Sequence, residues 1–274
     1  IGLVITEMAE ILFSETLQTL RQQSISRQRR HFLEQLLFST PSAPSETFER
    51  RGKALGVFLR RIHAVGVLSM AAELQDANTA AFYDTLLSIL RTHLGDTILL
   101  NHLYLGQKLI LFLGADIQPY LLTQVNKALH AAQAAGHMPC CGLAGGCESY
   151  TQLNRIYAQA DKALEVALST NTGQVCVYDD LVLELLLAPL SQESRSAFLE
   201  RIWGGTKSSM DEMLDFLEIY FACNGSVQAI SQKLFIHKNT VQYKIKKIAD
   251  ATGYDPRRLT DAVLLYLCVK LRKA

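Results

Sequence analysis

The spacing of hydrophobic positions changes along the chain and predicts three regions. Residues 1–38 carry apolar side chains at near-helical spacing, which predicts one long helix. Pro41 and Pro44 lie in the segment Ser39–Ser45 and mark a boundary after this helix. A long helix with no apolar partner in its own segment must bury its stripe elsewhere. We therefore expect either a homodimer seam or an upstream domain to cover it.

Between residues 46 and 178 the pattern alternates between helical and strand-like periods. Helices are predicted at 46–55, 80–92, 117–135 and 149–169, and strands at 62–70, 97–104, 108–113, 140–144 and 174–178. A Leu105-Gly106-Gln107 turn separates the second and third strands, which indicates a β-hairpin. This order predicts an α/β sandwich in which helices cover a mixed sheet.

From residue 181 onward the pattern is purely helical. Asn224-Gly225 ends a helix at 210–221, and Ser226 is a suitable N-cap for a helix at 227–234. Three residues later a second helix, 238–252, begins, and Gly253 ends it. An apolar helix at 259–271 closes the chain. Two short helices joined by three residues are typical of a helix-turn-helix.

The second of these helices has two distinct faces. Val241, Ile245 and Ile248 recur at helical spacing and predict the side that packs on the preceding helix. The opposite side presents Lys238, Asn239, Gln242, Tyr243, Lys246 and Lys247. Asn and Gln can bond adenine through two hydrogen bonds, and Lys can reach guanine or a phosphate. The pattern therefore predicts a DNA-reading face.

Charge supports this interpretation only when it is counted by segment. The 274 residues sum to a net charge of +1, which taken alone argues against a nucleic-acid binder. Residues 226–274, however, hold ten Lys and Arg against three Asp, a charge of +7, whereas residues 1–225 sum to −6. A basic module on an acidic body is typical of phosphate binding.

The sequence shows no pattern that indicates catalysis, metal binding or membrane insertion. The six cysteines fit no disulfide framework, and we interpret them as core thiols in a reducing cytoplasm. No metal-ligand spacing, nucleophile motif or phosphate-binding loop is present, and no apolar run is long enough for a membrane helix. We therefore predict no catalytic residue, metal, cofactor or membrane segment. The basic patch Arg27, Arg29, Arg30 and His31 is interpreted as a solvated face rather than a DNA contact.

The run Leu234–Ile248, followed by Thr252-Gly253-Tyr254-Asp255-Pro256, closely resembles the C-terminal helix-turn-helix of the PucR/CdaR family. These proteins are bacterial transcription regulators and include the sugar-diacid-utilisation regulators. The resemblance implies that operator DNA is contacted by His237, Lys238, Asn239, Thr240, Gln242, Tyr243 and Lys244, to which the facial argument adds Lys246 and Lys247.

Upstream, the segment Gly142–Gly146 and the helix after it resemble the family's central domain, which is related to GGDEF nucleotide cyclases. Active cyclases carry metal-binding carboxylates on a hairpin that here reads Leu105-Gly106-Gln107-Lys108-Leu109. Lys108 would repel a divalent cation, and Glu73 with Asp76 forms no convincing metal pair. We expect a non-catalytic scaffold; the alternative is a degenerate nucleotide-binding or cyclase-like domain.

The resulting expectation is a three-part chain of α/β (α+β) class. Residues 1–38 form a linker or dimerisation helix, 39–204 a degenerate GGDEF-like domain, and 205–274 an all-α helix-turn-helix domain. We expect a homodimer on double-stranded operator DNA that controls carbohydrate (sugar diacid) or related catabolic genes. Because the first residue is Ile1 rather than Met, we also expect a missing upstream sensory domain that binds a small-molecule effector.

Overall fold

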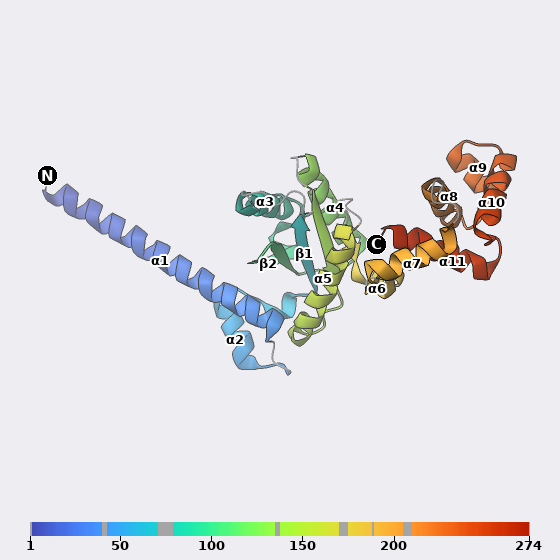
Figure 1. The fold of residues 1–274 in the computed structure, drawn as a ribbon. Helices are drawn as coiled ribbons and strands as arrows, with labels where there is room; N and C mark the ends of the chain where they lie inside the picture. Colours follow the sequence, from blue (N-terminus) through green and yellow to red (C-terminus); the bar gives the residue numbers. More distant parts are fainter. Residues whose placement is uncertain are drawn as a thin grey trace. The chain divides into compact units, whose positions relative to one another are not determined.

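The computed structural model describes residues 2–39, 43–70, 79–134, 138–169, 175–187, 189–204 and 210–273. The chain divides into two compact units, Ile1–Leu181 and Val182–Ala274. Figure 1 shows a sheet with its helices in the first unit and helices alone in the second. The first unit has an apolar core on each face of its sheet, the second unit has a core of its own, and each unit is described by itself.

The first unit is built on a five-stranded sheet of order β2-β3-β1-β4-β5. Its strands are β1 (Ala64–Met70), β2 (Leu99–Leu105), β3 (Lys108–Leu113), β4 (Pro139–Ala144) and β5 (Val175–Val177). All neighbours are antiparallel except β4 and β5, which are parallel. The predicted hairpin is confirmed, because Leu105 faces Lys108 across the turn and Gly106 adopts a positive φ of 58°.

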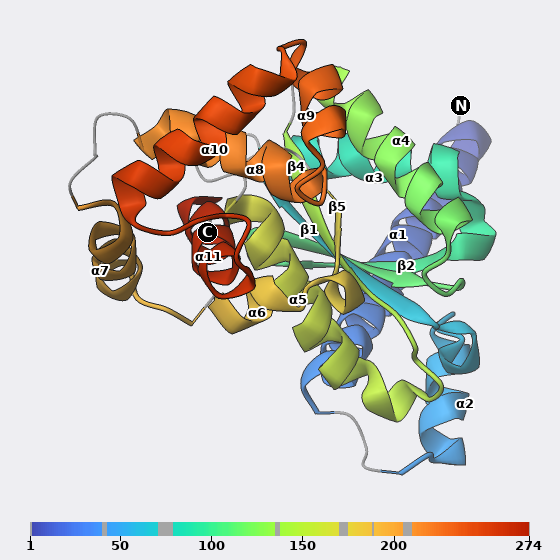
Figure 2. The same ribbon diagram turned by 90° about the vertical axis from the view of Figure 1, so that its right-hand side faces the viewer.

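Helices cover both faces of this sheet (Figure 2). On one face lie α3 (Thr79–Ile98, kinked at Gly95) and α4 (Pro119–Ala134). The other face carries α5 (Leu153–Ser169), α2 (Glu46–Ala54) and the C-terminal end of α1 (Gly2–Phe38). Side chains of β1 alternate between the two cores, Val65 and Val67 on one side and Leu68 on the other. The predicted α/β sandwich on a mixed sheet is confirmed.

Short 3₁₀ turns complete this unit: η1 (Leu59–Arg61), η3 (Tyr150–Gln152) and η4 (Tyr178–Asp180). The predicted helix 149–169 is therefore a 3₁₀ turn followed by α5. The predicted strand 174–178 is shorter than expected, since β5 ends at Val177 and Tyr178 begins η4.

Among the described side chains of the long helix α1, those of its last turns pack into the core. Phe32, Leu33, Leu36 and Leu37 are buried in the core. Residues 17–31 are exposed, with Leu20 and other apolar side chains among them. The helix predicted over 1–38 is thus confirmed for 2–38, and within the described part of the chain no element covers the apolar side chains between residues 17 and 31.

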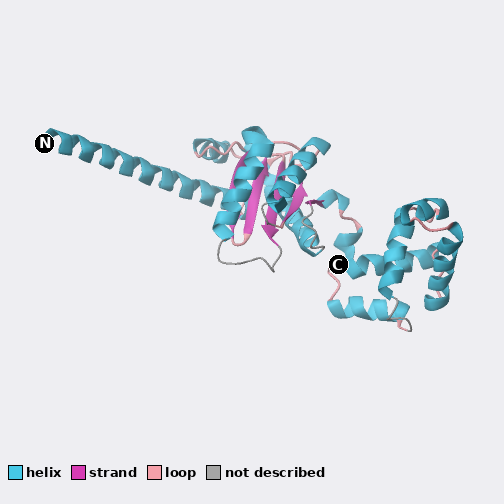
Figure 3. Cartoon of the chain, turned by 90° about the horizontal axis from the view of Figure 1, so that it is seen from above, coloured by secondary structure: helices cyan, strands magenta, loops and turns pink. Residues whose placement is uncertain are grey.

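The second unit consists of helices in every element that the structure describes there (Figure 3). They are α6 (Leu183–Leu187), α7 (Gln192–Trp203), α8 (Met210–Ala222), α9 (Val227–Leu234), α10 (Lys238–Thr252) and α11 (Leu259–Lys273). Ile202 and Trp203 of α7 are buried in the same core as Leu214 and Leu265. For this reason α7 belongs to the second compact unit, which begins at Val182, and the domain boundary of 204/205 drawn from the sequence stays a prediction.

The cysteines are all free thiols, and Cys140, Cys141, Cys147 and Cys268 are buried, as the core-thiol interpretation predicts. Burial raises the pKa of Cys147 and of Cys268 to about 11, so both remain protonated near neutral pH. Among the described residues, no helix combines the length and apolar character needed to cross a bilayer.

Candidate nucleic-acid interface

Side-chain caps define where the two helices of the helix-turn-helix begin. Ser226 Oγ accepts a hydrogen bond from the Ala229 amide at 3.3 Å and caps α9, as predicted. His237 Nδ1 accepts one from the Asn239 amide at 3.2 Å and caps α10. At its other end α10 stops at Gly253, whose φ of 78° suits glycine. The predicted bounds of both helices are confirmed.

The turn between the helices is closed by backbone hydrogen bonds. The Ile236 amide donates to Ser231 O at 3.1 Å and the Phe235 amide to Gln232 O at 3.4 Å, the pattern of a Schellman motif. This motif requires a left-handed residue, and Phe235 has φ 54° and ψ 39°. For a residue with a Cβ this conformation costs roughly 1–2 kcal/mol. The pattern of apolar positions gave no indication of this strain.

The inward face of α10 is the one that the sequence predicts. Val241, Ile245 and Ile248 are buried and lie in one core with Ile230 of α9. Burial of these side chains fixes the rotation of α10 about its axis, so the opposite face must point outward. The structure exposes on that face or at the N-terminal end the following predicted contact residues: His237, Lys238, Asn239, Thr240, Gln242, Tyr243, Lys246 and Lys247.

Lys244 is the predicted contact residue that the structure places elsewhere. Its Nζ lies 2.7 Å from Glu212 Oε1 of α8 and over the ring of Phe216, 5.9 Å from the ring centroid. At about 100° per residue, Lys244 is rotated only about 60° from Val241, toward the buried face. The facial argument omits Lys244 and the family motif includes it. In this structure it binds α8.

Ion pairs divide into two groups the nine basic residues of this module whose side chains the structure describes. Five are paired with carboxylates: Lys244, Arg257, Arg258, Lys270 and Arg272. Four others are exposed and form no ion pair with the described residues: Lys233, Lys238, Lys246 and Lys247. All four lie on α9 and α10, so the uncompensated positive charge of the module gathers on the helix-turn-helix.

The hairpin of the first unit is held by polar contacts. Lys108 Nζ lies 2.5 Å from Asp161 Oδ1 of α5. Gln107 O accepts hydrogen bonds from Ser69 Oγ at 2.9 Å and from the hydroxyl of Tyr83. In the described part of the chain, no group of three His, Cys, Asp or Glu side chains is placed to hold a metal ion. Glu73 and Asp76 lie outside the described residues.

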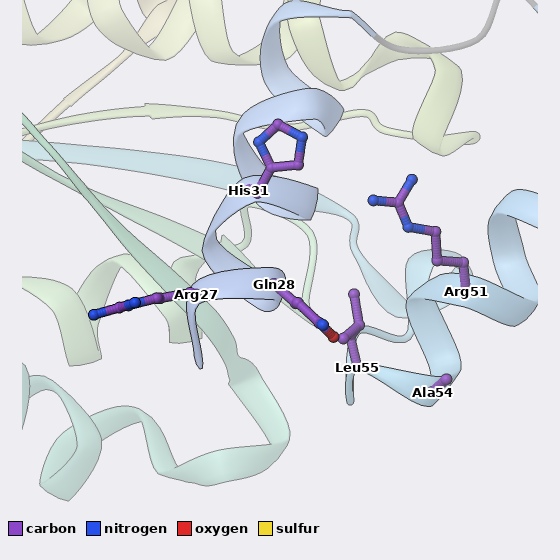
Figure 4. Close-up of a pocket in the computed structure, with 6 residues that line it drawn as sticks. All are labelled: Arg27, Gln28, His31, Arg51, Ala54 and Leu55. Carbon is purple, nitrogen blue, oxygen red and sulfur yellow. The ribbon is translucent and has the colours of Figure 1, made fainter. Parts of the chain in front are cut away.

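A hollow of about 560 Å³ lies between α1 and α2 and includes part of the basic patch from the sequence. It is lined by Arg27, Gln28 and His31 of α1 and by Arg51, Ala54 and Leu55 of α2. Figure 4 shows the Arg27 side chain pointing away from Arg51, whose Nη1 instead donates to Gln35 Oε1 at 3.2 Å. Because the cations do not converge, we assign no ligand to this hollow. The four residues of the patch are exposed, as predicted.

Comparison with protein families assigns both parts of this architecture. Residues 213–271 match the PucR C-terminal helix-turn-helix domain, and residues 40–166 match the GGDEF-like domain. The chain thus carries a GGDEF-like domain followed by a PucR-type helix-turn-helix. The architecture is therefore similar to that of the PucR/CdaR regulators, two of which are described next.

Individual relatives match over parts of their length. The chain is 33% identical over 96 residues to the carbohydrate diacid regulator of Escherichia coli (34% of this chain, 25% of that protein). It is 29% identical over 129 residues to the proline-responsive transcriptional activator PutR of Bacillus subtilis (44% and 31%). The matched segments span 13% to 39% of the curated relatives. A solved regulator of polyketide synthase expression from Bifidobacterium adolescentis is 17% identical over 89% of this chain and 97% of its own, with a TM-score of 0.37.

Proposed function

We propose that this chain binds double-stranded operator DNA through α9 and α10 and thereby regulates transcription. The observation that supports this most directly is the gathering of Lys233, Lys238, Lys246 and Lys247, exposed and without carboxylate partners, on these two helices. Exposed lysines release counterions when they neutralise phosphates, which supplies sequence-independent affinity. The five paired cations of the module are neutralised within the fold and contribute less to this term.

We assign recognition of the DNA base sequence to the N-terminal half of α10. Asn239, Gln242 and Tyr243 are exposed between the unpaired lysines, and recognition helices contact bases with their N-terminal residues. Asn and Gln amides can form paired hydrogen bonds with adenine in the major groove. His237 and Thr240, at the positive end of the helix dipole, are suited to a phosphate.

The proposal includes a homodimer. Helix-turn-helix proteins commonly bind as dimers to half-sites one helical turn apart, about 34–36 Å. The exposed apolar side chains of α1, Leu17, Leu20 and Ile25, offer an area that a second copy would bury. Sedimentation of the chain at increasing concentration tests this part, and a monomer at the concentrations that saturate DNA would contradict it.

For the genes controlled, we propose sugar diacid or related catabolic operons, because one relative is named as a carbohydrate diacid regulator. PutR is named as proline-responsive, so relatives differ in the signal. Selecting bound sequences from a random duplex library, and locating them in the source genome, tests the operator proposal. Enrichment of no sequence would contradict specific operator binding.

We infer further that the GGDEF-like domain is a scaffold and not an enzyme. Lys108 and Asp161 form an ion pair at the hairpin that carries the carboxylates in active cyclases. Titration calorimetry with GTP and Mg²⁺ is expected to give no binding heat. Saturable heat that is lost in Lys108→Ala would instead favour the nucleotide-binding alternative.

Asn239→Ala is expected to relax base preference more than it lowers overall affinity. Removal of one bidentate base contact costs about 1–3 kcal/mol of discrimination, whereas nonspecific phosphate contacts remain. The measurement is the ratio of affinities for a selected duplex and for a scrambled one. The matched control is Asn154→Ala, an exposed asparagine on α5. If both variants keep the wild-type ratio, Asn239 does not read bases.

A further inference from the structure

Phe235, in the turn before α10, combines a disfavoured backbone conformation with an exposed side chain. Every other described residue with a positive φ is Gly or Asn: Gly56, Gly95, Gly106, Gly146, Asn224, Gly225 and Gly253. The contrast with Gly253 is direct, because both residues follow the last turn of a helix in the same helix-turn-helix. A Schellman turn favours Gly or Asn. The backbone therefore gives no reason for a phenylalanine here.

The packing of the domain gives no reason either. Phe235 is 95% exposed, more than any other large hydrophobic side chain that the structure describes. A phenylalanine that stays in water contributes no burial to the folded state. Asn at this position would suit the turn better and expose no apolar ring. Such strain, when an otherwise regular turn retains it, points to a role outside the fold.

The position of Phe235 indicates what its ring contacts. It precedes His237, the N-cap of α10, by two residues, a distance of at most about 7 Å along the chain. Its exposed neighbours are polar or basic, namely Gln232, Lys233, His237 and Lys238. A second copy of this face would bring like charges together, and these exposed neighbours along the chain offer an apolar protein partner no further apolar side chain. A polyanion that also carries apolar groups would complement both the basic side chains around Phe235 and its exposed ring.

We propose that Phe235 is an apolar DNA contact, which packs against a thymine methyl group or a deoxyribose beside the base-reading residues of α10. The inference rests on the proposed DNA binding and adds a specificity element to it. Phenylalanine is suited to contact with the thymine methyl in the major groove. In this arrangement the strained backbone at Phe235 is retained because the ring contacts DNA in the protein–DNA complex.

Phe235→Asn separates the two properties of the residue. Asn tolerates the left-handed conformation, so the variant is expected to unfold at the wild-type temperature or a few degrees above it. Its affinity for a duplex selected by the wild type is expected to fall about tenfold, because an apolar contact is lost. Phe235→Leu, which keeps an apolar side chain, is expected to recover part of the affinity. Unchanged affinity in Phe235→Asn would overturn the proposal.

Substituted DNA identifies the group contacted. Deoxyuridine in place of each thymidine removes one methyl group at a time. If the ring packs on a methyl, one substitution weakens the wild type and leaves Phe235→Asn unaffected; if it packs on a sugar, no substitution distinguishes the proteins although the tenfold difference remains. Sedimentation without DNA is the further control, and a change of oligomeric state in Phe235→Asn with equal DNA affinity would assign the ring to a second copy and overturn the proposal. Failure of the wild type to bind any duplex would overturn the proposed function itself.

Discussion

Lys246→Ala combined with Lys247→Ala is expected to weaken binding to specific and nonspecific duplexes alike, by roughly 10- to 100-fold at moderate salt. Both lysines are exposed on α10 and form no ion pair with the described residues, so their charge is available to phosphates. Each lost phosphate contact also lowers the slope of log affinity against log salt by about one. Fluorescence anisotropy of a labelled duplex across a salt series measures both effects, and the slope is expected to fall by about two.

The matched control is Lys127→Ala combined with Lys162→Ala, which removes the same charge from exposed lysines of the first unit. It is expected to leave the slope unchanged. Lys244→Ala is a second control within α10, because this lysine already binds Glu212. If both double variants lower affinity equally, only net charge matters, and α10 is not the DNA-binding element.

Gly142→Ala is expected to destabilise the first unit by about 3 kcal/mol, the upper end of the usual cost of overpacking a core. Gly142 lies in β4 where the strand meets α5. A Cβ there would come 2.1 Å from Ala160 O and 2.2 Å from Leu164 N. These are backbone atoms of α5, so no side-chain rotation relieves the clash, and helix and sheet must separate. Urea denaturation followed by circular dichroism measures the loss.

Gly66→Ala in the adjacent strand β1 provides the comparison. Its Cβ would meet Leu143 Cδ2 at 3.0 Å, the end of a flexible side chain that can shift. It is expected to cost less than half as much as Gly142→Ala. Equal losses in the two variants would show that close approach of the β4 and α5 backbones is not what requires glycine at position 142.

Local sequence patterns predicted most of the elements correctly, for a physical reason. A helix or a strand that buries one face must repeat apolar residues with its own period, and caps and turns need particular residues at particular positions. Val241, Ile245 and Ile248 therefore identified the buried face of α10. Ser226 marked the start of α9, and Gly253 marked the end of α10. Gly106 likewise marked the β2–β3 turn. The family motif over Leu234–Ile248 is equally local, which is why it could be recognised in the sequence.

Contacts between distant segments could not be predicted in this way. The charge count treats all ten basic residues of 226–274 alike, yet Lys244 is paired with Glu212 and Arg272 lies 2.8 Å from Asp215, both on α8. In the sequence, nothing distinguishes Phe235 from other apolar residues. Only the fold shows that its backbone is in the left-handed conformation and that its side chain is exposed. Similarly, only the fold shows that α7 packs with the C-terminal helices, because Trp203 is buried in the core that they share.

The sequence by itself thus determined most of the elements, the two-faced α10 and the resemblance to the PucR helix-turn-helix. The tertiary structure decided which cations remain available to DNA, why glycine is needed at position 142, and where the compact units separate. The difference is physical, because the spacing of apolar residues along a helix or strand indicates which of its faces is buried. Pairing, close approach and strain depend on which residues, far apart along the chain, meet in space.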